Sequence, residues 1–243
     1  LVVFYSTFFQ RAFDQVFHDV LLQKLPVIFC LDRAGLVGPD GPTHHGVFDI
    51  SMMINLPGIV IAAPKDGNEL DNLLLTALEG NVPFCIRYPK SNSINYDEKN
   101  ISKILDIGSW EYINKGKKIA ILATGSMVDV ATNSIDSINE KFNFIPTVVN
   151  CRFIKPFDKE FLNEIIESHD LIITMEEGAL KGGFGNSVLD YCRRDDIRVE
   201  SMGIKDSFIE HGTRQELLDL VGLNTKSLIN LIDAYINHRL GDN

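Results

Sequence analysis

The chain has 243 residues, of which 45% are hydrophobic and 23% are charged, and its formal net charge is −10. These values are ordinary for a folded protein of one or two domains and exclude wholesale disorder. Non-specific nucleic-acid binding requires clustered Lys and Arg, and spanning a bilayer requires roughly 20 consecutive apolar residues; the sequence offers neither. We therefore expect no nucleic-acid partner and no membrane partner.

Short apolar strands alternate with helix-like segments through the first 90 residues. Strands are expected at residues 1–5, 27–31, 59–62 and 83–87. Helices are expected at about 8–23, 49–54 and 66–79, the last capped by Asp66. A glycine-rich loop covers residues 32–46, and a loop of that length is usually functional.

A polar stretch rich in Asn and Ser, residues 90–100, is interpreted as part of a linker. A second alternating unit begins at Lys117. Its expected strands are 119–123, 146–150, 171–175 and 197–202, and its expected helices are 127–141, 158–168, 182–194 and two that begin at Thr213 and Thr225. The sequence thus predicts an α/β protein of two domains, each with a mainly parallel sheet flanked by helices.

The cysteines are widely spaced and show no Cys-x-x-Cys or Cys/His ligand pattern. They are Cys30, Cys85, Cys151 and Cys192. We expect all four to be reduced and structural, and we predict no metal ligands in this chain.

Three segments with polar chemistry follow strands of the first unit: residues 5–11, 32–46 and 87–90. The carboxyl ends of parallel strands meet at one edge of a sheet, where open α/β sheets hold their ligands. The aromatics that begin the first segment are suited to line a flat heteroaromatic ring. Phe9 and Phe13, however, have the i, i+4 spacing that is more typical of a core.

Arg33 and Arg87 are suited to converge on a phosphate, because a guanidinium is planar and permanently charged. His44 and His45 titrate near neutrality and can transfer protons, and Asp40 lies between glycines that allow a tight turn. Each feature also has a structural alternative. The Asp-Gly-Pro segment is often only a turn, either histidine can be solvated, and Arg87 can pair with a carboxylate.

Three motifs are similar, in order, to 1-deoxy-D-xylulose-5-phosphate synthases. They are YSTFFQRAFDQ at 5–15, DRAGLVG with DGPTH at 32–44, and RYP at 87–89. Beyond residue 100 the resemblance is weaker and is carried by ATGS at 123–126, RFIKP at 152–156, EEG at 176–178 and GGFG at 182–185. We read that glycine run as a strand-to-helix turn, since alone it is a weak phosphate signal.

The resemblance implies a three-domain enzyme of which this chain is a piece. Residues 1–95 then correspond to the later part of a pyrimidine-binding transketolase-like domain, 96–116 to a linker, and 117–243 to a transketolase C-terminal domain. The diphosphate of thiamine diphosphate and its Mg²⁺ are expected to be held by an N-terminal domain absent from this sequence. The activating glutamate of the family is also missing, so we expect residues 1–243 alone to be inactive.

The resemblance also assigns roles to residues of the motifs. Tyr5, Phe8 and Arg11 match positions around the aminopyrimidine ring of the cofactor. Arg33 and Arg87 match positions that hold the phosphate of glyceraldehyde 3-phosphate.

Asp40 and His44 match positions at the reacting centre, with His44 the better candidate for proton transfer; His45 has no such match. The implied reaction is a decarboxylative condensation of pyruvate with glyceraldehyde 3-phosphate, the first step of the non-mevalonate isoprenoid route, in a homodimer. The alternatives are another thiamine diphosphate enzyme of the transketolase or dehydrogenase β type, and a non-catalytic dimerisation module. The compartment expected is a plastid for a eukaryotic source and the cytoplasm for a bacterial one.

Overall fold

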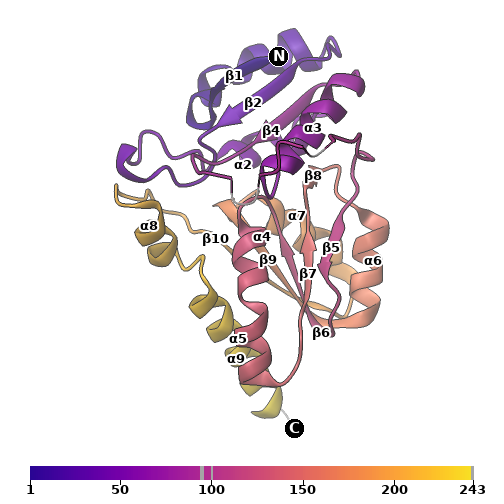
Figure 1. The fold of residues 1–243 in the computed structure, drawn as a ribbon, viewed down its shortest axis with the longest axis vertical. Coiled ribbons are helices and arrows are strands. Elements are labelled where there is room, and N and C mark those ends of the chain that lie inside the picture. The colour runs from indigo at the N-terminus through magenta and orange to yellow at the C-terminus, as the bar shows by residue number, and fades with distance from the viewer. Residues whose placement is uncertain (94–95, 100, 242–243) are drawn as a thin grey trace.

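The computed structural model describes residues 1–93, 96–99 and 101–241, which form two five-stranded sheets stacked along the long axis of the molecule (Figure 1). The first sheet has the order β1-β2-β4-β3-β8. Its strands are β1 (Val2–Tyr5), β2 (Ile28–Asp32), β3 (Val60–Ala62), β4 (Phe84–Arg87) and β8 (Phe153–Lys155). The first four are parallel and β8 is antiparallel to β3. The predicted strands of the first unit are confirmed to within one or two residues.

The second sheet has the order β10-β9-β6-β7-β5. Its strands are β5 (Glu111–Asn114), β6 (Lys118–Ala123), β7 (Thr147–Asn150), β9 (His169–Ala179) and β10 (Arg198–Ile204). All pair in parallel except β5, which is antiparallel to β7. Two mainly parallel sheets flanked by helices confirm the predicted fold class.

The helices follow the expected order, with differences in detail. They are η1 (Ser6–Arg11), α1 (Phe13–Gln15), η2 (Val16–Leu21), η3 (Gly38–Asp40), α2 (Asp49–Met53), α3 (Gly67–Glu79), α4 (Met127–Asn133), α5 (Ile135–Phe142), α6 (Lys159–Ser168), α7 (Phe184–Tyr191), η4 (Cys192–Arg194), α8 (Arg214–Val221) and α9 (Thr225–Gly241). The single helix expected at 8–23 is instead a 3₁₀ turn, one α turn and a π segment. The helix expected at 127–141 is interrupted at Ser134, whose hydroxyl donates to the Val130 carbonyl.

Side chains cap the N-termini of three helices, and the cap at Asp66 is the one predicted above. Asp66 accepts the Glu69 N–H at 2.8 Å, and Asp158 accepts the Phe161 N–H at 3.0 Å. Thr213 forms a full capping box with Glu216. Each cap satisfies helix N–H groups that have no partner within the helix.

Two strands were not expected from the sequence, and one of them, β8, ties the domains together. β5 falls inside the segment read as a linker and extends the second sheet, while β8 leaves the second unit to extend the first sheet. Part of the linker also packs along α3, where Leu105 N–H donates to Thr76 Oγ1. The later part of this connection, from Leu105 into β5, is therefore packed against the domains, whereas most described residues before it are exposed.

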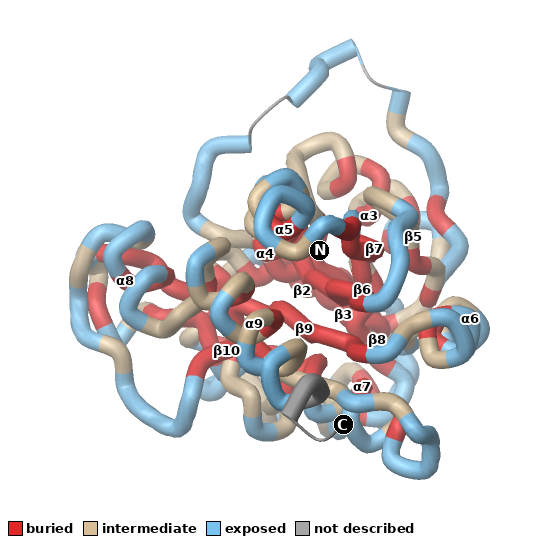
Figure 2. Tube along the Cα trace, turned by 90° about the horizontal axis from the view of Figure 1, so that it is seen from below, coloured by how far each residue is buried: buried red, intermediate tan, exposed pale blue. Residues whose placement is uncertain are grey.

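The largest apolar core lies between the two sheets. It combines first-domain side chains such as Phe9 and Ile61 with second-domain side chains such as Leu122 and Phe184, all completely buried. Figure 2 shows the strands of both sheets as the buried centre of the molecule. Burial of apolar surface holds the domains in one unit. All four cysteines are free and buried, as expected.

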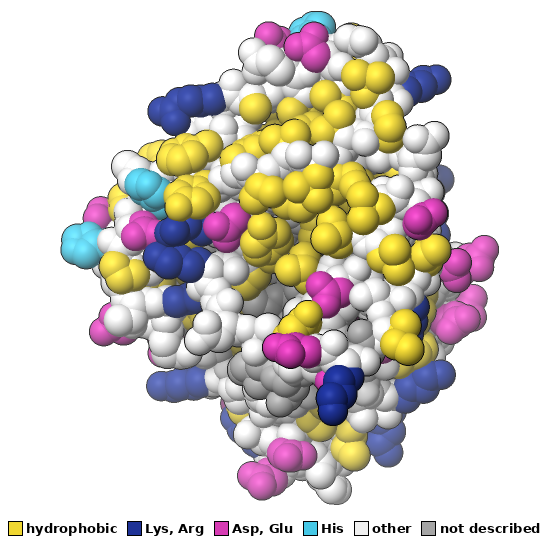
Figure 3. Space-filling view, turned by 45° about the horizontal axis from the view of Figure 1, so that its top comes forward, with side chains coloured by type: hydrophobic (Ala, Val, Ile, Leu, Met, Phe, Trp, Pro, Cys, Tyr) yellow, Lys and Arg dark blue, Asp and Glu magenta, His cyan; other side chains and the backbone are white. Residues whose placement is uncertain are grey.

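One end of the molecule is apolar and open. Figure 3 shows hydrophobic side chains gathered over the first domain, and the first strand, β1, is the edge of its sheet. Leu1, Val2 and Val3 are between 44% and 65% exposed there. Within the described ranges, no helix is both long enough and apolar enough to cross a membrane.

Candidate active site

The turn after β1 presents aromatic side chains beside a cation. Tyr5 stacks on Phe8 with ring centroids 5.7 Å apart, and the Arg11 guanidinium lies 5.7 Å from the centre of the Phe8 ring. Phe8 is 36% exposed, whereas Phe9 is completely buried. Tyr5, Phe8 and Arg11 are thus brought together, and the core interpretation of Phe9 is the correct one.

The loop from Asp32 to Gly46 is closed at its base. Gly35 and Gly46 exchange two backbone hydrogen bonds, both of 2.8 Å. The backbone takes positive φ at Arg33 (61°), just before this closure, and at Gly41 (74°) within it. Positive φ is uncommon for a non-glycine residue, so Arg33 is held by its surroundings in a sparsely populated conformation.

Arg33, Asp40 and Lys90 form an ion cluster next to the aromatics. Arg33 Nη1 lies 2.5 Å and Lys90 Nζ 3.1 Å from Asp40 Oδ2, and the Arg33 guanidinium lies 4.1 Å from the centre of the Tyr5 ring. The hydrogen bond from Lys90, with the charges of Lys90 and Arg33, lowers the pKa of Asp40. Arg33 Nε, although buried, has no hydrogen-bond partner among the described residues.

His44 completes this cluster. Its ring lies 5.7 Å from the ring of Phe8 and 6.4 Å from that of Tyr5, and its Nδ1 is 2.8 Å from Thr43 Oγ1. The neighbouring His45 is only 4% exposed; its Nδ1 accepts the Val37 N–H at 3.1 Å. The two histidines therefore differ: His44 lies with the aromatics and His45 fixes the loop.

Arg87 lies apart from this cluster in its contacts. Its guanidinium is 5% exposed; Nε donates to Asp49 Oδ2 at 2.8 Å and Nη2 to the Glu177 carbonyl at 3.0 Å. Burial alone lowers the pKa of Arg87, but the Asp49 carboxylate outweighs it, so the pKa is raised. The structure shows the carboxylate pairing that the sequence left open as an alternative, with a buried partner, and it does not bring Arg87 together with Arg33.

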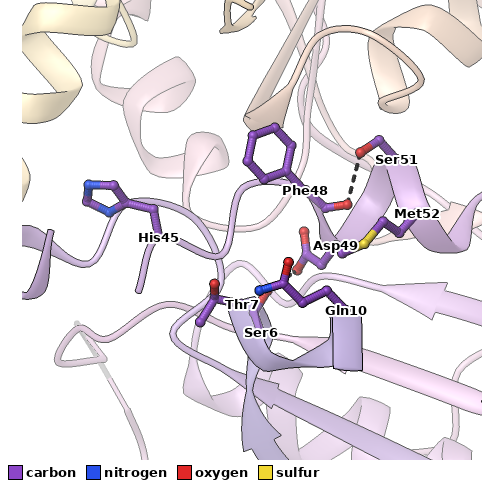
Figure 4. A pocket seen from close by; sticks show the side chains of 8 residues that line it. All are labelled: Ser6, Thr7, Gln10, His45, Phe48, Asp49, Ser51 and Met52. Atoms are coloured by element: carbon purple, nitrogen blue, oxygen red, sulfur yellow. Dashed lines mark hydrogen bonds between the residues drawn. The ribbon is translucent and has the colours of Figure 1, made fainter. Parts of the chain in front are cut away.

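Asp49 is a residue that the sequence reasoning missed. Its carboxylate also accepts the Ser6 hydroxyl at 2.9 Å, which links Arg87 to the turn that carries Tyr5 and Phe8. Asp49 opens a short helix, and nothing in its local sequence marks it as a buried partner. A cavity of about 270 Å³ lies beside it, lined by side chains from η1, His45 and the start of α2 (Figure 4).

Glu176, near the end of β9, contacts the start of α7. Glu176 accepts the Phe184 and Gly185 N–H groups at 2.9 and 2.8 Å, and its burial raises its pKa to about 7 against the lowering effect of these two bonds. The amides that start α7 are thus already occupied. The glycine run at 182–185 is a turn, as predicted, and not a phosphate site. No cluster of three or more His, Cys, Asp or Glu side chains within the described residues is arranged to hold a metal ion.

Comparisons with known proteins agree with this architecture. The model of the transketolase pyrimidine-binding domain matches residues 1–94, and that of the transketolase C-terminal domain matches residues 108–228. A split-gene transketolase, solved as an inactive β4 tetramer, superposes with a TM-score of 0.83 at 24% identity, over 96% of this chain and 74% of that one. Transketolase from Campylobacter jejuni superposes with a TM-score of 0.76 at 21% identity, over 96% of this chain and 35% of that one.

Among curated proteins, the chain is similar in sequence to 1-deoxy-D-xylulose-5-phosphate synthases. The 1-deoxy-D-xylulose-5-phosphate synthase of Pseudoalteromonas translucida is 41% identical over 98% of this chain, and that of Clostridium tetani is 47% identical over 93%. The chain spans only 38% and 36% of the length of these relatives. It is similar to part of these synthases, and by its two domains the chain belongs to the transketolase family.

Proposed function

We propose that this chain supplies the pyrimidine-binding and C-terminal domains of a 1-deoxy-D-xylulose-5-phosphate synthase. The whole enzyme would be a thiamine diphosphate-dependent transferase that joins pyruvate to glyceraldehyde 3-phosphate with loss of carbon dioxide, at the start of non-mevalonate isoprenoid synthesis. The observation that carries this proposal is the convergence of Tyr5, Phe8, Arg33, Asp40 and His44 from two separated motifs. The relatives to which the chain is similar support it.

The cofactor subsite is assigned to the aromatic turn. Phe8 is partly exposed, Tyr5 stacks against it, and Arg11 lies over the same ring. A flat heteroaromatic ring such as an aminopyrimidine fits this arrangement, since aromatic rings pack in offset or edge-to-face geometry. Thiamine diphosphate would supply the carbanion chemistry when bound. Its diphosphate and Mg²⁺ would be held by the N-terminal domain of the whole enzyme, which is not in this sequence.

The phosphate of the aldehyde substrate is assigned to Arg33 and Arg87. Arg33 Nε is buried and lies 3.8 Å from Asp32 Oδ2, but it makes no hydrogen bond among the described residues, and a phosphate oxygen would supply one. Lys90, 47% exposed, adds a second cation on the same side. Arg87 can join only if Asp49 releases its guanidinium, so Arg33 is the primary anchor and Arg87 the conditional one.

Asp40 and His44 are assigned to the reacting centre. His44 carries an imidazole, a group that can accept or donate a proton, and it faces the aromatic turn at which the cofactor ring would lie. The lowered pKa of Asp40 keeps its carboxylate ionised, so that it accepts hydrogen bonds and orients Arg33 and Lys90.

We also propose that the enzyme is a homodimer. The open edge of β1 and the exposed side chains of Leu1, Val2 and Val3 form an apolar surface of the kind that other protein covers. Such a surface fits either the remainder of a chain as long as its relatives or a second subunit. A source among bacteria would place the enzyme in the cytoplasm, and a plastid-bearing source would place it in the plastid.

Release of carbon dioxide from pyruvate tests the proposal. The full-length protein is assayed with thiamine diphosphate and Mg²⁺, with and without glyceraldehyde 3-phosphate. Release that depends on this aldehyde supports the synthase. Release that depends on a lipoyl acceptor would instead favour a dehydrogenase β-type enzyme, and transfer of a two-carbon unit from a ketose phosphate to an aldose phosphate, without carbon dioxide, would favour a transketolase. Neither release nor transfer with any acceptor would favour an assembly module without catalysis.

A further inference from the structure

Glu177 joins the C-terminal domain to the loop that carries Arg33, Asp40 and His44. Its carboxylate Oε1 accepts the backbone N–H of Leu36 at 2.8 Å, across 141 residues of sequence. Its Oε2 accepts Arg214 Nη2 at 2.5 Å and the Ser126 hydroxyl at 2.7 Å. The side chain is 3% exposed. A buried carboxylate with three donors is held in one orientation.

Glycine at position 35 shows how closely the loop lies on this carboxylate. A Cβ atom built on Gly35 would lie 2.5 Å from Glu177 Cδ, and the backbone there has φ of +79°. Neither the space nor the conformation suits another residue. At Gly35 and Leu36 the loop backbone therefore packs directly against the Glu177 side chain.

The segment before α8 borders the same loop farther along. A Cβ atom on Gly38 would lie 3.3 Å from the Gly212 carbonyl, and one on Gly41 would lie 3.3 Å from His211 Cβ. Figure 1 shows the loop of the first domain beside α8. Arg214, the first residue of α8, connects this border to Glu177. The loop is thus held at its base and at its tip by one domain.

We propose that Glu177, set by Arg214 and Ser126, is a positioning residue for the substrate loop. Its carboxylate contacts none of the side chains of Arg33, Asp40 and His44; it fixes the backbone between Arg33 and Asp40 through the Leu36 N–H, while its backbone carbonyl accepts Arg87 Nη2. The C-terminal domain would then control how well the phosphate anchor and the proton-transfer group are placed. The kinetic part of this inference rests on the proposed function, whereas the effect on the loop does not.

The test compares two arginine variants of the full-length protein. Arg214→Met removes the charge that orients Glu177. Arg152→Met is the matched control, because Arg152 is 12% exposed and pairs with Glu69 and Glu111 across the domains without contacting the loop. Hydrogen exchange of the amides of residues 33–46 is measured in each, with the melting temperature as a measure of global stability.

We expect the Leu36 amide to exchange at least about 10-fold faster in Arg214→Met and less than about 2-fold faster in Arg152→Met. Only Arg214 orients the Glu177 carboxylate that accepts this amide, so only its loss should favour local opening of the loop. The value of kcat/KM for the aldehyde should fall by a similar factor in Arg214→Met, with partial recovery in Arg214→Lys. Ser126→Ala gives a milder form of the same change if Arg214→Met does not fold.

Unchanged exchange across 33–46, or equal increases in the two arginine variants, would overturn the inference, because Arg214 would then serve global stability alone. Failure of the proposed function has a different signature. In that case the wild-type protein releases no carbon dioxide in an aldehyde-dependent manner, while the exchange of the Leu36 amide still separates the two variants.

Discussion

Replacing Arg87 by Met separates a structural role for this arginine from a role in binding phosphate. The substitution keeps most of the side-chain volume but removes the donors to Asp49 and to the Glu177 carbonyl. Asp49 is 1% exposed, so its carboxylate would keep only the Ser6 hydroxyl and the Ile50 N–H. A charge left in that place without a counter-ion is strongly destabilising.

The size of the effect follows from burial. Breaking a buried ion pair by removing one partner costs about 3–5 kcal/mol of unfolding free energy. With a urea m-value of about 3 kcal/mol per molar, the unfolding midpoint should fall by about 1 to 1.7 M. Fluorescence of Trp110 reports the transition, because it is the single tryptophan of the 243 residues and is 5% exposed. The double variant with Asp49→Asn should recover part of this loss, since the unpaired charge is gone.

Arg33→Met is the matched control. Its pair with Asp40 is partly exposed, with side chains 20% and 30% accessible, so the stability change should stay below about 1 kcal/mol. The affinity of the Arg33→Met enzyme for glyceraldehyde 3-phosphate should fall, while its affinity for pyruvate should change little. The reasoning is refuted if Arg87→Met leaves the urea midpoint unchanged and selectively weakens the aldehyde, because Arg87 would then be the phosphate ligand and not the partner of Asp49.

Three further substitutions test the site and the fold. His44→Ala should lower turnover by about 10²-fold or more with an unchanged melting temperature, and wild-type turnover would remove His44 from the mechanism. Glu176 has its pKa raised to about 7, so its favourable contribution is complete below its unfolded value near 4.5 and is lost as the pH rises through 7. The stability advantage of the wild type over Glu176→Gln should therefore shrink by roughly 3 kcal/mol between pH 4.5 and pH 8 in urea titrations, and parallel pH profiles would contradict the burial argument. Asp158→Ala should lower the free energy of unfolding, measured by calorimetry, by about 1–2 kcal/mol, because it removes the cap of α6 and the acceptor of the Trp110 backbone N–H. Lys159→Ala, at an exposed position, is the control; an equal loss in both variants would show that the cap does not stabilise the fold.

Local chemistry explains what the sequence predicted well. The cap at Asp66 depends on a neighbour three residues away, so a short window contains the whole signal. The buried parallel strands are short apolar runs, which periodicity identifies. The meeting of Tyr5, Phe8, Arg33, Asp40 and His44 was predictable because parallel strands deliver the residues after them to one edge.

The features that could not be predicted from the sequence are those in which a residue or strand pairs with another that is distant in the chain. β5 and β8 are short antiparallel additions whose pairing is decided by strands elsewhere in the chain. Arg87 reads equally well as an anion ligand or as an ion-pair partner until Asp49 is seen beside it. The carboxylate of Glu177 has no local mark at all, because its partner Leu36 lies 141 residues away.

The place of β8 has a consequence for how this polypeptide can be divided. β8 follows β7 in the chain, but it hydrogen-bonds to β3, with Ile61 opposite Lys155 and Ala62 opposite Phe153. A cut near residue 100 would leave one product with a bare edge at β3 and the other with an apolar strand that has no sheet to join. Such ends pair with each other in aggregates. Excision at the apparent domain boundary is therefore unsafe, and any division of the gene that preserves this sheet would keep β3 and β8 in one product.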